Sequence, residues 1–254
     1  FMMGLVANYP IALAPGMGLN AYFAFNVVGN AHHPVSWQIA LAAVFVSGLL
    51  FIVFSLFKVR EAIVNALPMS LKMSIAAGIG LFLALIALKG AGIVVGNPTT
   101  LVSMGDVHDP RALLALMGFF MIIVLDYYRI RGAIILSILT ITAIAMVTGL
   151  AEYHGVVGSI PSIVPTFMQM DFNGLFNLSM VSVIFVFFLV DLFDSTGTLV
   201  GVSHRAGLLR DGKLPRLKKA LLADSTAIVA GAALGTSSTT PFIESAAGVA
   251  AGGR

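Results

Sequence analysis

The chain has 254 residues, of which 59 % are hydrophobic and 10 % charged, and its formal net charge is +3. Soluble domains carry about 25 % charged residues, so this composition argues against a soluble protein. The mean hydropathy of +1.01 agrees with a protein that lies in a membrane. The sequence has no cysteine, which excludes disulfides, thiolate metal sites and a cysteine nucleophile.

Apolar runs of membrane-spanning length recur along the whole chain. A spanning helix needs about 20 apolar residues. The candidate spans are residues 1–8, 10–28, 35–57, 73–95, 112–128, 132–150, 175–202, 220–235 and 236–253. We therefore predict an all-α polytopic membrane protein in contact with the lipid bilayer. Because both ends of the chain fall in apolar stretches, we expect it to be part of a longer protein.

Lysine and arginine gather in every second loop, which predicts the orientation of the chain. Cytoplasmic loops collect basic residues, and the basic loops here are residues 58–72, 129–131 and 203–219. The intervening loops, 96–111 and 151–174, are mainly acidic. We predict that the basic loops are cytoplasmic. We assign their charge to topology and expect no nucleic-acid partner.

Two carboxylates lie deep in the span at 175–202. Asp191 and Asp194 follow sixteen apolar or weakly polar residues, which is about 24 Å of helix. A carboxylate at the centre of a spanning helix costs about 2.5–3.5 kcal/mol on insertion scales, so each needs a reason. Being three residues apart, the two share one helix face. We interpret them as functional; the structural alternative is that they only cap or pair with neighbouring helices.

Two further aspartates lie near the ends of spans. For Asp224, an interfacial ion pair with Lys218 or Lys219 and a functional role are both open interpretations. Asp126 adjoins two tyrosines at a span end, which is typical of an interfacial aromatic belt, and we assign it no function.

Two apolar segments are interrupted by proline and glycine ahead of a polar side chain. In one, Pro15 and Gly16 precede Asn20; in the other, Pro241 precedes Glu244. Non-helical backbone at membrane depth is tolerated only inside protein or around a cavity. Interrupted segments at corresponding positions of two halves mark the binding site of inverted-repeat transporters. We predict a substrate site here, against the plainer alternative of two unrelated kinks.

Several motifs make the chain similar to a known family. The segments GMGLNAYFAF, DLFDSTGTLVGV, ADSTAIVAGAALGTSSTTPFIESAAGVAAGGR and GNPTTLVSMGD resemble those of AzgA-like hypoxanthine, adenine and guanine permeases of the nucleobase-ascorbate transporter superfamily. The resemblance implies the uracil-permease-type fold of two inverted seven-helix repeats (7+7). The chain would run from about helix 2 to the start of helix 10. Residues 1–57 and 175–254 would belong to the core domain and 73–150 to the gate domain.

The same resemblance implies roles for single residues. Asn20, Asp191, Asp194 and Glu244 would contact the substrate, while Asp224 and Glu244 would support or carry proton coupling. We rank Asp191 and Glu244 as the essential pair, facing each other across the substrate. A purine edge carries donors and acceptors that carboxylates and an asparagine amide can read.

The implied function is a secondary active transporter of the cell membrane that imports adenine, guanine or hypoxanthine by proton symport, without another cofactor and as a homodimer. One alternative is a carrier of anions or other solutes with the same fold, which the acidic site disfavours. Another is an intramembrane aspartyl protease, which needs aspartates from two helices, whereas Asp191 and Asp194 share one. No metal-ligand spacing such as HExxH is present, so we expect neither a metal site nor an enzyme.

Overall fold

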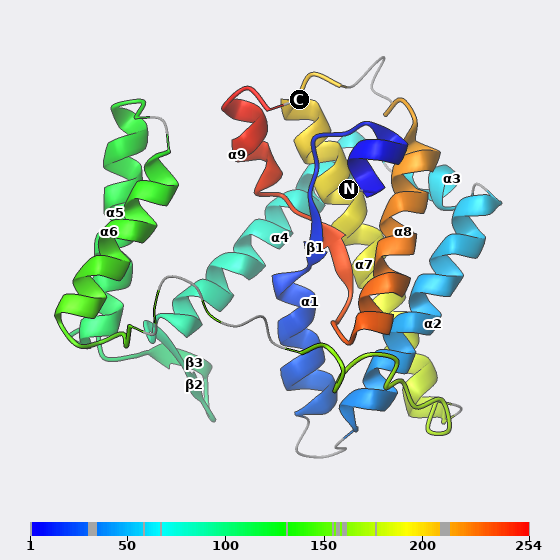
Figure 1. Ribbon diagram of the computed structural model, residues 1–254, viewed down its shortest axis with the longest axis horizontal. Helices are drawn as coiled ribbons and strands as arrows, with labels where there is room; N and C mark the ends of the chain where they lie inside the picture. Colours follow the sequence, from blue (N-terminus) through cyan, green and yellow to red (C-terminus); the bar gives the residue numbers. More distant parts are fainter. Residues whose placement is uncertain are drawn as a thin grey trace. The chain divides into compact units, whose positions relative to one another are not determined.

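A computed structural model describes residues 2–29, 35–57, 59–66, 68–130, 132–153, 155, 158, 162–175, 177–208 and 214–253. The chain forms two compact units, one of Phe1–Gly80 with Ser162–Arg254 and one of Leu81–Pro161. The division falls inside helix α4 (Met69–Gly90). Figure 1 labels the helices and strands of both units.

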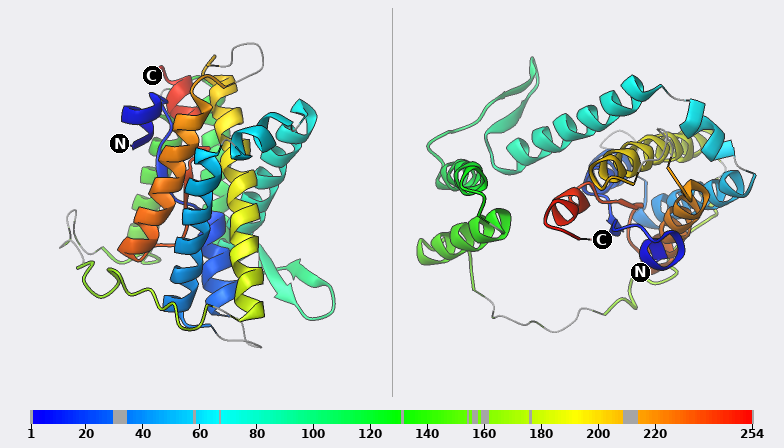
Figure 2. Two further views of the ribbon diagram at one scale, coloured as in Figure 1. Left: turned by 90° about the vertical axis from the view of Figure 1, so that its right-hand side faces the viewer. Right: turned by 90° about the horizontal axis from the view of Figure 1, so that it is seen from above.

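The first unit joins segments from both ends of the chain. Its helices are η1 (Met3–Ala7, π-helical), α1 (Met17–Ala21), η2 (Tyr22–Val28, π-helical), α2 (Trp37–Leu56), α3 (Val59–Ala66), α7 (Leu178–Arg205), α8 (Leu217–Leu234) and α9 (Ser245–Ala250). Its strands are β1 (Leu13–Pro15) and β4 (Thr239–Pro241). Helix α2 packs against both α7 and α8, and the three run side by side in Figure 2.

A small residue and an aromatic stack fix these three helices together. A Cβ at Gly48 of α2 would lie 2.9 Å from the Cγ2 atoms of both Ile228 and Val229 of α8, so glycine is what permits this close approach. On another side of α2, Phe51 stacks on Phe188 of α7 with ring centroids 4.5 Å apart. Such a pair contributes about 0.5–1.5 kcal/mol beyond the area it buries. The three helices therefore form a rigid support for the segments that cross between them.

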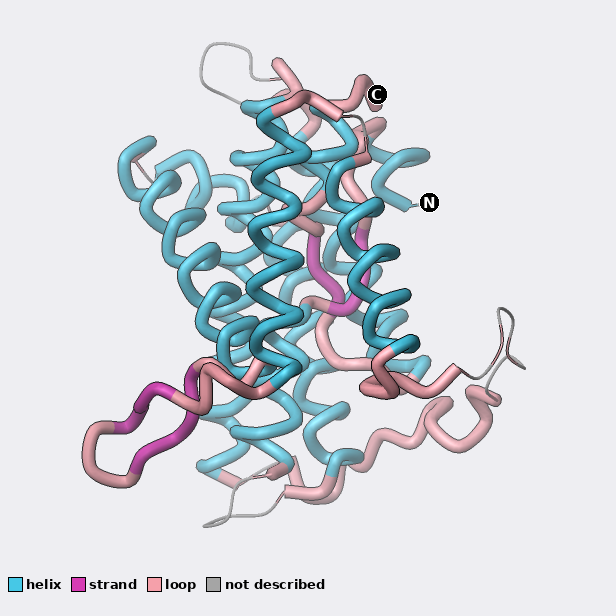
Figure 3. The backbone as a smooth tube through the Cα atoms, turned by 90° about the vertical axis from the view of Figure 1, so that its left-hand side faces the viewer, coloured by secondary structure: helices cyan, strands magenta, loops and turns pink. Residues whose placement is uncertain are grey.

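The two interrupted segments meet as a pair of antiparallel strands. β1 pairs with β4 in a register that sets Ala14 opposite Thr240, and Figure 3 shows the pair running between the helices. The pairing extends by one bond, because the Gly16 amide donates to the Ser238 carbonyl over 3.0 Å. A Cβ at Gly16 would lie 2.7 Å from Oγ1 of Thr240, so a side chain here would push the strands apart. The backbone N–H and C=O groups that lack helical partners in one interrupted segment thus form hydrogen bonds with the other segment.

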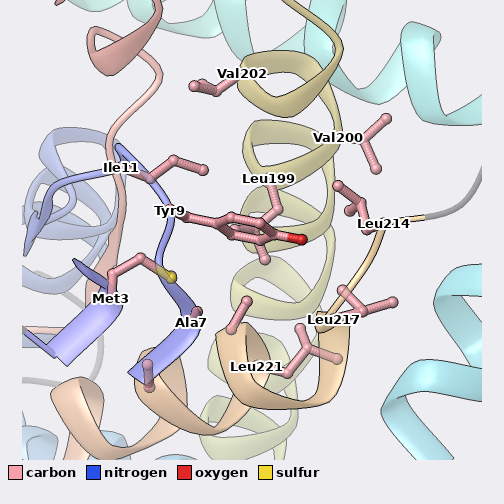
Figure 4. Packing of buried hydrophobic residues seen from close by; sticks show 12 residues of the cluster. Met3, Ala7, Tyr9, Ile11, Leu199, Val200, Val202, Leu214, Leu217 and Leu221 are labelled. Carbon is pink, nitrogen blue, oxygen red and sulfur yellow. The ribbon is translucent and has the colours of Figure 1, made fainter. Parts of the chain in front are cut away.

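The segment before β1 is tied to the start of α8. Tyr9 lies among buried apolar residues, including Leu199 of α7, as Figure 4 shows. Its hydroxyl donates to the carbonyl of Pro215. The Arg216 guanidinium lies 5.5 Å from the centre of the Tyr9 ring and donates to the Asn8 carbonyl over 3.4 Å. These contacts hold the chain on the N-terminal side of β1.

The second unit holds a helical hairpin and a strand hairpin. Its elements beyond α4 are β2 (Val94–Asn97), β3 (Leu101–Met104), α5 (Pro110–Tyr127) and α6 (Ala133–Val147). The Asp109 side chain caps α5 by accepting from the Arg111 amide over 2.8 Å. Helix α5 packs against α6 near Gly118, where a Cβ would lie 3.1 Å from Cγ1 of Ile141.

Three described helices are long and apolar enough to cross a membrane: Trp37–Leu56, Pro110–Tyr127 and Ser179–Arg205. Half of the first window and 56 % of the third are buried inside the structure, whereas only 6 % of the second is. α2 and α7 are therefore interior helices of their unit, and α5 presents apolar side chains of the kind that suit lipid.

The structure corrects the sequence-based elements in three places. The chain is mainly helical but not all-α, because four short strands occur among the described residues. The predicted span 73–95 is too long: α4 ends at Gly90, Gly92 takes a positive φ of 74°, and the apolar residues that follow form β2. The predicted loop 58–72 contains helix α3 and the start of α4, although Lys58 itself lies outside the described residues.

Candidate functional site

Strand β4 brings a row of hydroxyl side chains against α7. β4 contacts both α7 and α8, and helix α8 ends just before it at Gly235, whose φ is +90°. A glycine accepts this left-handed conformation without strain, so the chain can leave the helix and turn extended. The residues from Ser237 to Thr240 are all buried. Ser238 and Thr240 lie against the carboxylate-bearing helix α7, whereas Ser237 contacts Asn20 of α1 and Thr239 lies beside Gly231 of α8.

Asp191 is fully buried on α7. Its Oδ2 atom accepts a hydrogen bond from the Ser238 hydroxyl over 2.6 Å, and Ser238 is itself fully buried. A charged acceptor makes such a bond about twice as strong as a neutral one. Asp191 is therefore joined directly to the second interrupted segment.

Asn20 lies on α1, one turn after the first interrupted segment. Its backbone N–H donates to the Gly16 carbonyl over 2.8 Å, which starts the helix immediately after the break. Its side-chain oxygen accepts a hydrogen bond from the Ser237 hydroxyl. Neighbouring serines of one segment thus bind Asn20 of α1 and Asp191 of α7, two residues that the sequence had placed in the site.

Asp194 lies one turn beyond Asp191 on the same helix and is partly buried. The Thr240 side chain and the carboxylates of Asp224 and Glu244 are close enough to act on its carboxylate. Three acidic groups from α7, α8 and the start of α9 therefore lie in one region. Nearby on α7, the Thr196 hydroxyl donates to the Leu192 carbonyl over 2.5 Å, so it is directed back into its own helix.

The other acidic candidates differ in burial. Asp224 is fully buried in α8, which an interfacial position does not explain. Glu244 is exposed and directly precedes α9. The described contacts relate Glu244 to Asp194, whereas the facing of Glu244 and Asp191 across a substrate stays a prediction. Asp126 is exposed near the end of α5, in the second unit.

Three hydroxyl residues of the site were not predicted from the sequence. Ser237, Ser238 and Thr240 contact Asn20, Asp191 and Asp194 respectively. The signal that would have found them is the unbroken run of hydroxyl residues between Gly235 and Pro241. Among the described residues, no group of three or more histidine, aspartate or glutamate side chains is arranged to hold a metal ion.

A family comparison identifies the kind of protein that carries this arrangement. The profile of the Permease family, Xan_ur_permease, matches residues 1–254. The chain belongs to the permease family. As a member of this family with membrane-spanning helices, it is a multi-pass membrane protein, which confirms the sequence-based expectation on that point.

Curated relatives of this permease carry more specific names. Guanine/hypoxanthine permease PbuG of Bacillus subtilis is 47 % identical over 256 residues, which is 100 % of this chain and 58 % of the relative. Adenine permease AdeP of Escherichia coli is 45 % identical over 254 residues, or 100 % of this chain and 57 % of the relative. The chain therefore spans somewhat over half the length of the curated relatives it matches. The resemblance to hypoxanthine, adenine and guanine permeases is confirmed at the level of the family.

A solved structure shares the fold of this permease. The transmembrane domain of the cyanobacterial bicarbonate transporter BicA matches 96 % of this chain and 64 % of its own, with a TM-score of 0.65 and 18 % identity. At this identity the likeness shows the fold alone, which is that of a transmembrane transporter domain.

Proposed function

We propose that the protein is a secondary active transporter that imports a purine nucleobase, adenine, guanine or hypoxanthine, by proton symport. The observation that carries this proposal is the pairing of β1 with β4 beside Asp191, with Ser238 linking the strand pair to the carboxylate. The names of the relatives PbuG and AdeP support a purine as the substrate.

The polar groups of the site suit the rim of a purine. A purine base is flat and carries hydrogen-bond donors and acceptors around its edge. Carboxylates accept from N–H groups, and an asparagine amide both donates and accepts. We assign substrate contacts to Asn20, Asp191, Asp194 and Glu244, which come from α1, α7 and the segment before α9. Groups on separate elements around one extended pair can engage several edges of one base.

Proton coupling is proposed for the acidic cluster. Asp224 and Glu244 both act electrostatically on Asp194. Neighbouring carboxylates repel one another when all are ionised, so binding a proton to the cluster relieves repulsion. A substrate that changes the spacing or solvation of the cluster thereby changes its affinity for a proton. We assign Asp224 and Glu244 to proton coupling or its support, with the proton as the sole coupling partner.

The transport cycle is proposed to alternate access between a core and a gate domain. Residues 1–57 and 175–254 would form the core and 73–150 the gate, each as part of an inverted repeat of seven helices. The division of the chain into Phe1–Gly80 with Ser162–Arg254, and Leu81–Pro161, supports this assignment, as does the likeness to BicA. A homodimer is proposed with it.

Uptake into proteoliposomes tests the proposed function. The full-length protein that contains this chain is purified and reconstituted, an inward proton gradient is imposed, and entry of labelled hypoxanthine is measured against unlabelled adenine, guanine, uracil and bicarbonate. We expect saturable uptake that purines inhibit and that a protonophore abolishes. Uptake of bicarbonate instead of purine would make the protein an anion carrier. Purine uptake that ignores the protonophore would remove proton coupling.

A further inference from the structure

The run of hydroxyl residues between Gly235 and Pro241 is not used by the proposed contacts with substrate. Two of its members point at site residues from consecutive positions, since Ser237 bonds the Asn20 side chain and Ser238 bonds Asp191. Ser237 is 6 % exposed and Ser238 is fully buried. Their hydroxyls are therefore hydrogen-bonded to protein side chains and shielded from solvent.

The backbone around these serines is held in place. The Ser238 carbonyl accepts from the Gly16 amide over 3.0 Å, and β4 begins at the next residue. On the other side, α1 starts from the Gly16 carbonyl, to which the backbone N–H of Asn20 donates over 2.8 Å. Ser237 is therefore adjacent to the bond between Gly16 and Ser238, and Asn20 lies one helical turn after it. Their side chains meet in a fixed geometry.

The direction of the Ser237 bond decides what Asn20 can offer. An asparagine amide has an oxygen that accepts and an NH2 group that donates. The Ser237 hydroxyl donates to the Asn20 oxygen, so that oxygen is engaged by the protein. This bond fixes the orientation of the amide with its oxygen toward Ser237, so the NH2 group is the part that can serve a ligand on the opposite side. Without the serine, the amide can turn by about 180° and offer either atom.

We propose that Ser237 is a positioning residue that holds the Asn20 amide with its NH2 group toward the ligand, so that the site reads a hydrogen-bond acceptor on the base. This inference rests on the proposed function, because it takes the ligand to be a purine. It adds a specificity rule: a ring nitrogen or carbonyl oxygen of the base faces Asn20. Ser238 acts likewise on Asp191, keeping one carboxylate oxygen bound to the protein.

Purine analogues that lack one acceptor test the rule. Binding of hypoxanthine is compared with binding of its 3-deaza and 7-deaza analogues, each of which replaces an acceptor ring nitrogen by C–H, and of purine, which lacks the carbonyl. In the wild type, one of these analogues is expected to bind about tenfold or more weakly than hypoxanthine, since a buried donor is left unpaired. In Ser237→Ala that ratio should fall below about threefold, because the freed amide can turn.

Three further variants separate positioning from general damage. Ser237→Thr keeps the hydroxyl and should keep the wild-type discrimination. Ser47→Ala removes another fully buried serine hydroxyl, on α2, and should also leave the discrimination unchanged. In an Asn20→Ala background, Ser237→Ala should have no further effect on the ratio, because Ser237 acts through Asn20. If Ser237→Ala does not fold, Ser237→Cys, which weakens the donor at similar volume, takes its place and should lower the ratio.

The possible results distinguish failure of the positioning role from failure of the proposed function. Discrimination in Ser237→Ala equal to that of the wild type, or a wild type that binds every analogue like hypoxanthine, overturns the positioning role while purine binding stands. An additive effect of Ser237→Ala on top of Asn20→Ala overturns it as well. A folded wild type that binds no purine overturns the proposed function and this inference with it.

Discussion

The Ser238 hydroxyl donates to Oδ2 of Asp191 over 2.6 Å, and both side chains are fully buried. Through this bond the carboxylate of α7 is attached to the segment that pairs with β1. A displacement of the strand pair therefore acts directly on Asp191, and binding at Asp191 acts on the strand pair. This hydrogen bond therefore couples α7 to the paired strands β1 and β4. The following predictions test the site and the packing that supports it.

Replacing Gly16 by alanine should separate the paired strands. The new Cβ would lie 2.7 Å from Thr240 Oγ1, and overpacking of this kind costs about 1–3 kcal/mol. We expect a lower thermal unfolding midpoint and at least tenfold slower purine uptake. Adding Thr240→Ala removes the clashing atom and should restore the midpoint but not the uptake, because the Thr240 side chain also acts on the Asp194 carboxylate. A single variant as stable as the wild type would show that the close approach is not needed.

Replacing Gly48 by alanine should loosen α2 from α8. The added methyl group would lie 2.9 Å from the Cγ2 atoms of Ile228 and Val229, and we expect a loss of about 1–3 kcal/mol of stability. The matched control is Gly201→Ala on α7, where no atom lies within 4 Å of the added Cβ. That variant should stay within about 1 kcal/mol of the wild type, since alanine favours helix over glycine. Equal thermal midpoints for the two variants would contradict this account of the packing.

Replacing Glu244 by glutamine should uncouple transport from the proton gradient. Glutamine keeps the shape of glutamate but cannot release a proton, and Glu244 acts on the Asp194 carboxylate. We expect the variant to exchange internal for external purine in preloaded vesicles without accumulating purine against a gradient. The control is Glu152→Gln, an exposed glutamate in the second unit, which should accumulate purine normally. Full accumulation by the Glu244 variant would place the coupling elsewhere.

Cysteine labelling tests the predicted orientation. The natural chain has no cysteine, so single cysteines report without background. A cysteine at the exposed residue Ser162 should react with an impermeant reagent in intact cells. A cysteine at Gly212, between the described residues Leu208 and Leu214, should react only after permeabilisation. The opposite pattern would reverse the orientation drawn from the basic loops.

Much of the site could be predicted from the sequence, because its segments contain residues that are unfavourable inside a membrane-spanning helix. Proline and glycine ahead of Asn20 and Glu244 marked both interrupted segments, and the structure pairs those segments as strands. Asp191 was noticeable because a carboxylate is costly in an apolar helix, and it is fully buried. Such features are local, so a single sequence carries them.

The rest of the site depends on long-range pairing that no local pattern specifies. The Ser238 hydroxyl can be assigned to the site only when β4 is known to lie against α7. Ser237 can be assigned to it only when its contact with Asn20 is known. The position of Asp224 also depends on the tertiary structure. Its place in the sequence near two lysines fitted an interfacial role equally well, but the structure buries it completely. The hairpin of β2 and β3 was missed because its apolar, β-branched residues continue the hydrophobic run of α4.

The central claim is that Asp191, held by the strand pair, binds a purine, and equilibrium binding to the Asp191→Asn variant tests it most directly. Asparagine keeps an oxygen that can accept from Ser238, so the fold should survive while the charge is lost. Losing a charged hydrogen bond should weaken binding of labelled hypoxanthine by about 1.5–3 kcal/mol, or roughly ten- to a hundredfold. The control Asp126→Asn, an exposed aspartate of α5, should bind like the wild type. Wild-type affinity in a folded Asp191→Asn protein would remove Asp191 from the site and contradict the account.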